Sequence, residues 1–395
     1  MTIMSLSHTP SAMLARLPGG PKTIGAFCLI LVSYTTQTES MQYIQHNLGY
    51  SKPLFLLYVT HSSFLLLLPA YLLCIHFFTS AKVGHVWNLL KKDLTRQVHH
   101  FLEVSPTEPV PRLTWVVTMI AILFILTVAL TIPSISWFLA VPFTSMANIT
   151  SIYNTFSLWA LVFSVYFLKE NWDYLQACAV LLGVVGVSIS ATGSAVRPTA
   201  EEATGDKDKK TGLLSPAFMG DLLALIGAIS MAAYEILYKR LTEVPETSEA
   251  FIPIPSEETP IHDTTHADDV TAEDEDAMPF GVHALAMTTG IGLVTLCLFW
   301  IPLFFAHMYQ AEPLEMPRDG TVIAWIALSA TCGVLFNGSF AILLSLWGPV
   351  LASMSCLLTT VLVQLTDMVQ GIPFTWMSIL GNVIITVSFL CLLPW

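Results

Sequence analysis

The sequence predicts an all-α polytopic membrane protein of about ten transmembrane helices, arranged as two five-helix inverted repeats. Three observations lead to this fold class. The chain of 395 residues is 54% hydrophobic and only 11% charged, whereas a soluble domain carries about 25% charged residues. Its apolar residues gather in windows of roughly 20 residues, the helical length that crosses a bilayer core of about 30 Å. The two halves of the chain also repeat several features in the same order.

Ten apolar windows define the expected spans. The alternation of apolar and polar residues that membrane β-barrels show is absent, and backbone groups in lipid must find partners within their own segment. We therefore expect each window to be a helix. In chain order the windows are Thr23–Tyr43, Pro53–Phe78, Leu113–Val141, Met146–Leu168, Trp172–Thr192, Phe218–Tyr238, Gly281–Met308, Val322–Trp347, Leu351–Val369 and Phe374–Leu393.

Polar segments divide the chain into the remaining units. The stretch between spans two and three, which holds Lys91 and Lys92, is predicted to be a loop. Twelve of the 28 acidic residues lie between Glu243 and Asp276, without a Lys or Arg, and so few apolar residues cannot offset the entropy of ordering. The predicted organisation is a cytosolic N-terminus (1–22), a first five-helix half (23–193), a polar linker (194–217), span six (218–239), a disordered acidic loop (240–280) and spans seven to ten (281–395).

The charge distribution bears on orientation and on partners. With the N-terminus inside, 10 of the 16 Lys and Arg residues fall on the cytosolic side, as the positive-inside rule favours. The net charge of −12 comes mostly from the acidic loop. No broad basic surface is left to bind nucleic acid. The expected partners are the lipid bilayer and a small-molecule solute, and a homodimer is the oligomer to consider.

The sequence contains no recognisable catalytic or metal motif. The seven cysteines fall singly within apolar runs, without the paired spacing of zinc or disulfide frameworks. H-E-x-x-H, G-x-S-x-G and P-loop motifs are missing. We therefore expect neither an enzyme nor a bound metal or cofactor.

Ionisable residues within the spans are the first candidates for a functional site, because each costs on the order of 3 kcal/mol at mid-bilayer and normally faces a cavity or a partner. Glu39 lies in the polar half of span one, with Tyr43 one turn later on the same face. A helix end among lipid headgroups is the alternative. Glu235 lies in span six with Lys239 four residues later, so a structural ion pair is an equal alternative to a substrate or proton site.

Span four is the most polar of the ten windows. Its polar residues recur at three- and four-residue steps, and two more lie beside that face. Such a face could line a hydrophilic pathway, or its side chains could form hydrogen bonds between helices. The face comprises Asn148, Ser151, Thr155 and Trp159, flanked by Tyr153 and Asn154.

The second half has a similar set of polar residues. Thr360, Gln364 and Asp367 share one face of span nine, and Asn337 lies well inside span eight. His61 in span two has no acid or second histidine at relay spacing, which favours a hydrogen-bonded packing role. Of these positions, Asn337 and Thr360 are the candidates for the lining of a central cavity.

A weak internal repeat relates the two halves. Gly25 precedes Glu39 by 14 residues in span one, and Gly220 precedes Glu235 by 15 residues in span six. The last span of each half also opens with an aromatic residue seven positions before a small one. Repeats of this kind are common in transporters, whose binding site lies between the halves.

Four stretches resemble the drug/metabolite transporter (EamA-like) superfamily, and within it solute carrier family 35, subfamily F. Residues 37–64 end span one with an acid and continue into a polar-Lys-Pro turn. The other three are residues 137–190, residues 220–241 (GDLLALIGAISMAAYEILYKRL) and residues 333–368 (GVLFNGSFAILLSLWGPVLASMSCLLTTVLVQLTDM). The resemblance implies cytosolic termini, alternating access and a central cavity lined mainly by helices one, four, six and nine. We expect an endomembrane location, vacuolar or Golgi, rather than the plasma membrane.

These observations predict a transporter of a small solute. In this hypothesis Glu39 and Glu235 bind substrate or a coupled proton, while Tyr43, Asn148, Tyr153, Asn154, Asn337 and Thr360 line the cavity. The two acids favour an organic cation such as a thiamine-like compound.

Two alternatives remain open at this point. A nucleotide-sugar exchanger is one, although Tyr153, Asn154 and Thr155 match the aromatic-Tyr-Asn-Asn run of those carriers only in part, and span eight lacks their lysine. The other is a scaffold or receptor that transports nothing and whose acidic loop recruits a soluble partner.

Overall fold

The computed structural model describes residues 19–79, 82–105, 107–140, 143, 146–195, 216–243, 279–369 and 375–392. Within these residues the regular elements are helices, and no strand occurs. The predicted all-α class is therefore confirmed. Most of the predicted N-terminal tail, of the polar linker and of the acidic loop falls outside the described residues, as do the side chains of Asn148 and Asp367. The described ends of the tail and the linker belong to the helices that begin at Gly20 and Pro216 and the one that ends at Ala195.

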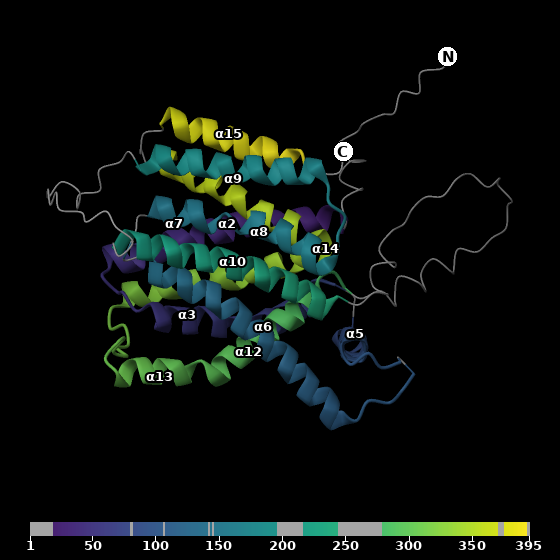
Figure 1. Cartoon of the computed structure of the whole chain (residues 1–395). Coiled ribbons are helices and arrows are strands. Elements are labelled where there is room, and N and C mark those ends of the chain that lie inside the picture. The colour runs from purple at the N-terminus through teal and green to yellow at the C-terminus, as the bar shows by residue number, and fades with distance from the viewer. Residues whose placement is uncertain are drawn as a thin grey trace, which may run out of the picture.

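The helices follow one another with short connections (Figure 1). Two of them continue into single π-helical segments, and one span contains a short 3-10 segment. Their bounds are α2 (Gly20–Gln42, then the π segment Tyr43–Asn47), α3 (Pro53–Ser62), the 3-10 segment Ser63–Leu66, α4 (Leu67–Phe78), α5 (Val83–Phe101), α6 (Arg112–Ala140), α7 (Met146–Tyr153), α8 (Phe156–Phe163, then the π segment Ser164–Leu168), α9 (Tyr174–Ala195), α10 (Pro216–Thr242), α12 (Val282–Leu298), α13 (Trp300–Met308), α14 (Gly320–Val369) and α15 (Trp376–Leu390).

Seven helical stretches among the described residues are long and apolar enough to cross a membrane. They make the chain an integral multi-pass membrane protein. The helix α15 is apolar but shorter, and α2, with its polar second half, falls outside this set. The count of ten spans stays a prediction. The seven stretches are Pro53–Phe78, Arg112–Ala140, Ser151–Leu168, Tyr174–Ala191, Phe218–Thr242, Val282–Met308 and Gly320–Thr366.

The 50-residue α14 is two helices separated by a break at Gly348. Gly348 has φ 77° and ψ 174°, a conformation that residues with a Cβ rarely adopt. Pro349 follows, and its ring cannot donate the backbone hydrogen bond of a continuing helix. The break falls in the short gap that the sequence predicts between spans eight and nine.

The predicted loop between spans two and three was wrong, because residues 83–101 form the helix α5. Val86, Leu90 and Val98 are buried and recur at helical spacing on one face. A window of about 20 residues averages these apolar positions with Lys91, Lys92 and other polar residues. Its hydropathy then resembles that of a loop, although the periodicity is that of an amphipathic helix.

The two halves of the chain pack against each other in a reciprocal way. α2, the first helix of the first half, packs on α14, while α10, the first helix of the second half, packs on α6. α9 and α15, which close the two halves, pack together at the edge of the bundle opposite α13 (Figure 1). A Cβ atom on Gly381 of α15 would lie 2.6 Å from the Gly186 carbonyl oxygen of α9. Small residues thus bring these two backbones into direct contact, as is common between membrane helices.

Candidate functional site

Glu235 is a fully buried carboxyl group on α10. Neither of its two side-chain oxygens has a hydrogen-bond partner among the described residues. Lys239, one turn later, instead places its Nζ 3.0 Å from Oε1 of Glu170, in the segment between α8 and α9. The structure therefore does not contain the predicted alternative of a Glu235–Lys239 ion pair, and Glu235 is left inside the bundle without a counter-ion in the described part of the chain.

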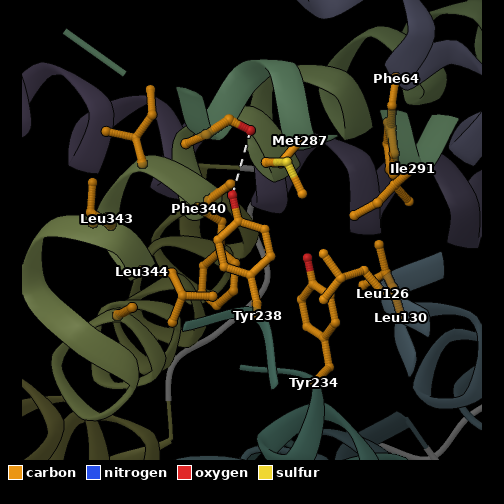
Figure 2. Close-up of a cluster of buried hydrophobic side chains, with 14 of the residues drawn as sticks. Phe64, Leu126, Leu130, Tyr234, Tyr238, Met287, Ile291, Phe340, Leu343 and Leu344 are labelled. Carbon is orange, nitrogen blue, oxygen red and sulfur yellow. Dashed lines mark hydrogen bonds between the residues drawn. The ribbon is translucent and has the colours of Figure 1, made fainter. Parts of the chain in front are cut away.

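Two tyrosines of α10 flank Glu235 and face the main apolar core. Tyr234 and Tyr238 lie side by side in Figure 2, and both are buried. The Tyr238 hydroxyl donates to the Ala284 carbonyl of α12 at 3.5 Å. Apolar side chains from four segments pack around them. They are Phe64 of the 3-10 segment; Leu126 and Leu130 of α6; Met287 and Ile291 of α12; and Phe340, Leu343 and Leu344 of α14. This apolar wall keeps water away from one side of the α10 face that carries Glu235.

Tyr153, the last residue of α7, connects Glu235 with two other helices. Glu235, Tyr34 of α2 and Cys356 of α14 all lie near enough to Tyr153 to act on it electrostatically. The ring of Tyr153 lies against Gly227 of α10, where a Cβ atom would come within 3.0 Å of Cε2. Helices α2, α7, α10 and the second part of α14 thus converge around Tyr153. They correspond to predicted spans one, four, six and nine.

The predicted polar faces of spans four and nine meet at a second contact. Nδ2 of Asn154 lies 3.4 Å from Oγ1 of Thr360, and the two residues are only 6% and 8% exposed. Thr155, in the turn between α7 and α8, does not join them, because its hydroxyl donates to the Ile152 carbonyl of α7 at 2.6 Å. Of the residues predicted from the sequence, Tyr153, Asn154, Glu235 and Thr360 therefore lie on the converging helices.

The other predicted residues lie elsewhere. Tyr43 is 38% exposed at the end of α2, where it packs on Trp325 with ring centroids 4.7 Å apart. Glu39 is partly buried one turn earlier. Asn337 donates from Nδ2 to the Gly333 carbonyl of its own helix at 2.9 Å. Asn148 belongs to α7, but its side chain is outside the described residues.

Gln364 shares a helical face with Thr360 but belongs to a separate buried polar cluster. Asn382 of α15 donates to its Oε1 at 2.8 Å, and its Nε2 donates to the hydroxyl of Ser190 on α9. Ser190 in turn donates to Oδ1 of Asn382 at 3.3 Å. We call these three residues the amide cluster. Its side-chain groups satisfy one another and tie together α9, α14 and α15.

The predicted packing role of His61 agrees with its surroundings. Its Nε2 lies 3.4 Å from the Ser134 hydroxyl of α6, and its ring stacks on Phe64 with centroids 5.0 Å apart. In the described part of the chain, no group of three or more His, Cys, Asp or Glu residues could hold a metal ion.

Sequence reasoning did not identify Tyr34, Cys356 or Gly227 as neighbours of the site. Hydropathy windows treat tyrosine and cysteine as apolar, so these residues do not stand out in a span. A usable signal was present in span six, where Tyr234 and Tyr238 bracket Glu235 within one helical turn. Gly227 lies two turns before Glu235, a position where a missing side chain leaves room for a ring from another helix.

Comparisons with known proteins give the following results. Residues 100–192 match the model of the EamA-like transporter family, a segment from the end of α5 to α9. No curated protein matches the chain. One solved structure, described only as "Crystal structure of protein", aligns with 94% of this chain and 96% of its own at 12% sequence identity and a TM-score of 0.52. At that identity the likeness concerns the fold alone. The family match over residues 100–192 and the apolar helices together support a multi-pass membrane transporter in general.

Proposed function

We propose that this protein moves a small organic cation across a membrane by alternating access, in exchange for a proton carried by Glu235. The observation that carries the proposal is a fully buried carboxyl group with both oxygens unpartnered among the described residues. The similarity to EamA-like transporters supplies the general activity. The thiamine-like compounds suggested by the sequence are the first substrates to test.

Energetics favour a functional role for Glu235. A buried polar group without a hydrogen bond costs roughly 1–3 kcal/mol by mutational measures. An apolar residue on α10 would avoid that cost, since the neighbouring Tyr234 and Tyr238 already pack in an apolar core. A carboxyl group that is protonated in one state of the protein and paired with a bound cation in another would have a reason to remain there.

The positions of the neighbouring groups suit this exchange. Tyr153 and Tyr34 lie within electrostatic reach and provide aromatic faces, which attract organic cations. Asn154 and Thr360 contribute polar atoms from two other helices. When a cation binds beside Glu235, the carboxyl group gives up its proton to water on the open side of the protein. When the cation leaves on the other side, the carboxyl group takes a proton from that side.

Uptake by the full chain reconstituted in liposomes tests the proposal. Radiolabelled thiamine, choline and tetraethylammonium are offered with an outward proton gradient or without one, while an enclosed dye reports internal pH. The wild type should take up at least one of these cations faster with the gradient, and uptake should move protons outward. In Glu235→Gln we expect uptake to fall by about tenfold or more, because the neutral amide cannot balance the cation.

Glu243→Gln is the matched control, since Glu243 is exposed directly after the end of α10. It should transport like the wild type. If Glu235→Gln keeps wild-type uptake and wild-type dependence on the gradient at equal amounts of folded protein, Glu235 has no role in transport. If the wild type moves neutral or anionic solutes but none of the cations, the assignment of substrate class is wrong.

A further inference from the structure

The helix α5 presents a cationic surface that the proposed transport function does not use. Its apolar side packs against α4 and the start of α12 through Val86 and Leu90. On the other side, Trp87 is 53% exposed, and Lys91 and Lys92 are exposed one turn later. Together they form a face in which an indole ring lies beside two ammonium groups.

Hardly any negative charge offsets this surface on α5 itself. Asp93 is the acidic residue of the helix, and it is only 6% exposed. Its Oδ2 lies 3.8 Å from Nε2 of His283 at the start of α12, so it faces the bundle. Arg96, partly exposed, extends the cationic side by a further turn. The exposed face of α5 therefore attracts anions.

The position of α5 relative to the spans places this face at the membrane surface. Nε2 of Gln97 donates to the Leu241 carbonyl at the end of α10, at 2.7 Å, and its Oε1 lies 3.0 Å from Nε2 of His283. These bonds attach α5 to one end of the bundle. In Figure 1 the spans run from left to right, whereas α5 is seen nearly end-on beside the right-hand end. The helix thus runs across the ends of the spans, in the plane of the membrane surface.

A groove lies between α5 and the first turn of α6. Its volume is about 350 Å³, and its lining consists of Trp87, Leu90, Lys91 and Leu94 of α5 and Trp115 of α6. Nε1 of Trp115 is buried and has no hydrogen-bond partner in the described part of the chain. Because Nε1 is itself shielded from solvent, the groove offers a ligand one ammonium group and apolar walls that include two indole rings.

We propose that this groove binds the headgroup of an anionic phospholipid from the surrounding leaflet. The phosphate would accept hydrogen bonds from Lys91, while Trp87, Leu90 and Leu94 contact the glycerol backbone and upper acyl chains. Tryptophan prefers this depth of a bilayer, and Lys and Arg near the surface attract anionic lipids. The exposed cationic face beyond the groove adds to this preference, and a zwitterionic lipid would gain nothing from it.

Lipid titration of the full-length protein tests this site independently of transport. The protein in a neutral detergent is titrated with dioleoylphosphatidylglycerol and, separately, with dioleoylphosphatidylcholine, and bound lipids are counted by native mass spectrometry. We expect tighter binding of the anionic lipid. Lys91→Gln should weaken it about fivefold, and Lys91→Arg should retain it.

Arg318→Gln is the matched control. Arg318 is exposed before α14, in the segment whose Glu312 accepts hydrogen bonds from the first turn of α3, at the other end of the bundle. It should bind both lipids like the wild type. The proposal is overturned if phosphatidylcholine binds as tightly as phosphatidylglycerol, if Arg318→Gln weakens binding as much as Lys91→Gln, or if millimolar glycerol phosphate displaces the lipid. The last result would assign the groove to a soluble phosphate ester.

Discussion

Two buried polar regions of this bundle differ in how their hydrogen bonds are satisfied. In the amide cluster, Ser190, Gln364 and Asn382 bond to one another across three helices. Around Glu235, a carboxyl group of equal burial has no hydrogen-bond partner among the described residues. Ser190, Gln364 and Glu235 lie on helices long and apolar enough to cross a membrane, where unmet hydrogen bonds are costly.

This difference distinguishes polar side chains that stabilise the fold from a polar side chain that is retained for transport. A satisfied cluster between helices contributes to stability, typically by about 0.6 kcal/mol for each bond in membrane proteins. An unsatisfied carboxyl group reduces stability and therefore needs another reason to be present. Substitutions in the amide cluster should thus change stability at nearly constant transport, and substitutions near Glu235 should do the reverse.

The largest loss of stability is expected for Gly381→Ala, beside the amide cluster. The added Cβ atom would lie 2.6 Å from both the Gly186 carbonyl oxygen and the Ser190 backbone nitrogen. Backbone atoms cannot move aside, so α9 and α15 must separate, at a cost of about 3 kcal/mol. Thermal unfolding in detergent measures the effect. Gly25→Ala is the control, because a Cβ atom there meets nothing within 4 Å. Equal melting temperatures for the two variants would show that the helices are not in close contact.

Gln364→Leu should have the next largest effect. It removes the hydrogen bonds of the Gln364 side chain with Asn382 and Ser190 and leaves those two residues with fewer partners, so we expect a loss of about 1–2 kcal/mol. Uptake per folded molecule should stay near the wild-type value below the melting temperature. A stable variant that fails to transport would show that the amide cluster takes part in transport. The cluster would then no longer differ from Glu235 in function.

Gly227→Ala should act mainly on transport. Its Cβ atom would approach the ring of Tyr153 to 3.0 Å, and the ring must shift by a few tenths of an ångström. We expect a loss of stability of about 1 kcal/mol with a severalfold fall in uptake, because Tyr153 is within electrostatic reach of Glu235. Liposome uptake together with thermal unfolding distinguishes the two effects. Unchanged uptake would exclude Tyr153 from the substrate site.

The smallest effect is expected at His99, a satisfied polar group outside the membrane spans. Hydrogen bonds to the Thr95 carbonyl at 2.7 Å and the Glu108 carbonyl at 2.9 Å raise the pKa of His99 above its usual value. Its stabilising effect is therefore full below a pH of about 6.5 and is lost as the pH rises through the raised pKa.

His99→Gln should accordingly lower the melting temperature by ~1–2 °C at pH 5.5 and by less at pH 8.5. His100→Gln, on the exposed neighbour, should show no such trend. A larger effect of His99→Gln at pH 8.5 than at pH 5.5 would mean that the neutral form is the one stabilised.

The sequence was sufficient to predict the all-α membrane class, because long apolar windows have few alternative structures. Polarity within spans also singled out Glu235, Asn154 and Thr360, which the structure buries, and their part in a binding site stays a prediction. The sequence could not show that Lys239 pairs with Glu170 rather than with Glu235, since that choice depends on how α8 and α9 meet the end of α10. Nor could it assign Gln364 to the amide cluster, because Gln364 and Thr360 share a helical face but contact different helices.

The amphipathic α5 was overlooked for a different reason. Its apolar positions Val86, Leu90 and Val98 are interrupted by charged residues, so a hydropathy window does not register them. A search for helical periodicity over shorter windows would have detected it. The neighbours Tyr34 and Cys356 could not have been found in this way, because residues that face a site and residues that face lipid have the same apolar character.

Thermal unfolding and cation uptake of Glu235→Leu, measured on the same preparation, test the central claim most directly. The substitution removes a buried carboxyl group without a partner and fills the site with apolar atoms. If Glu235 is retained for transport, the variant should melt at or above the wild-type temperature and show no gradient-driven uptake. If the variant melts several degrees lower and still transports when folded, Glu235 is a structural residue, and the contrast between the two polar regions does not hold.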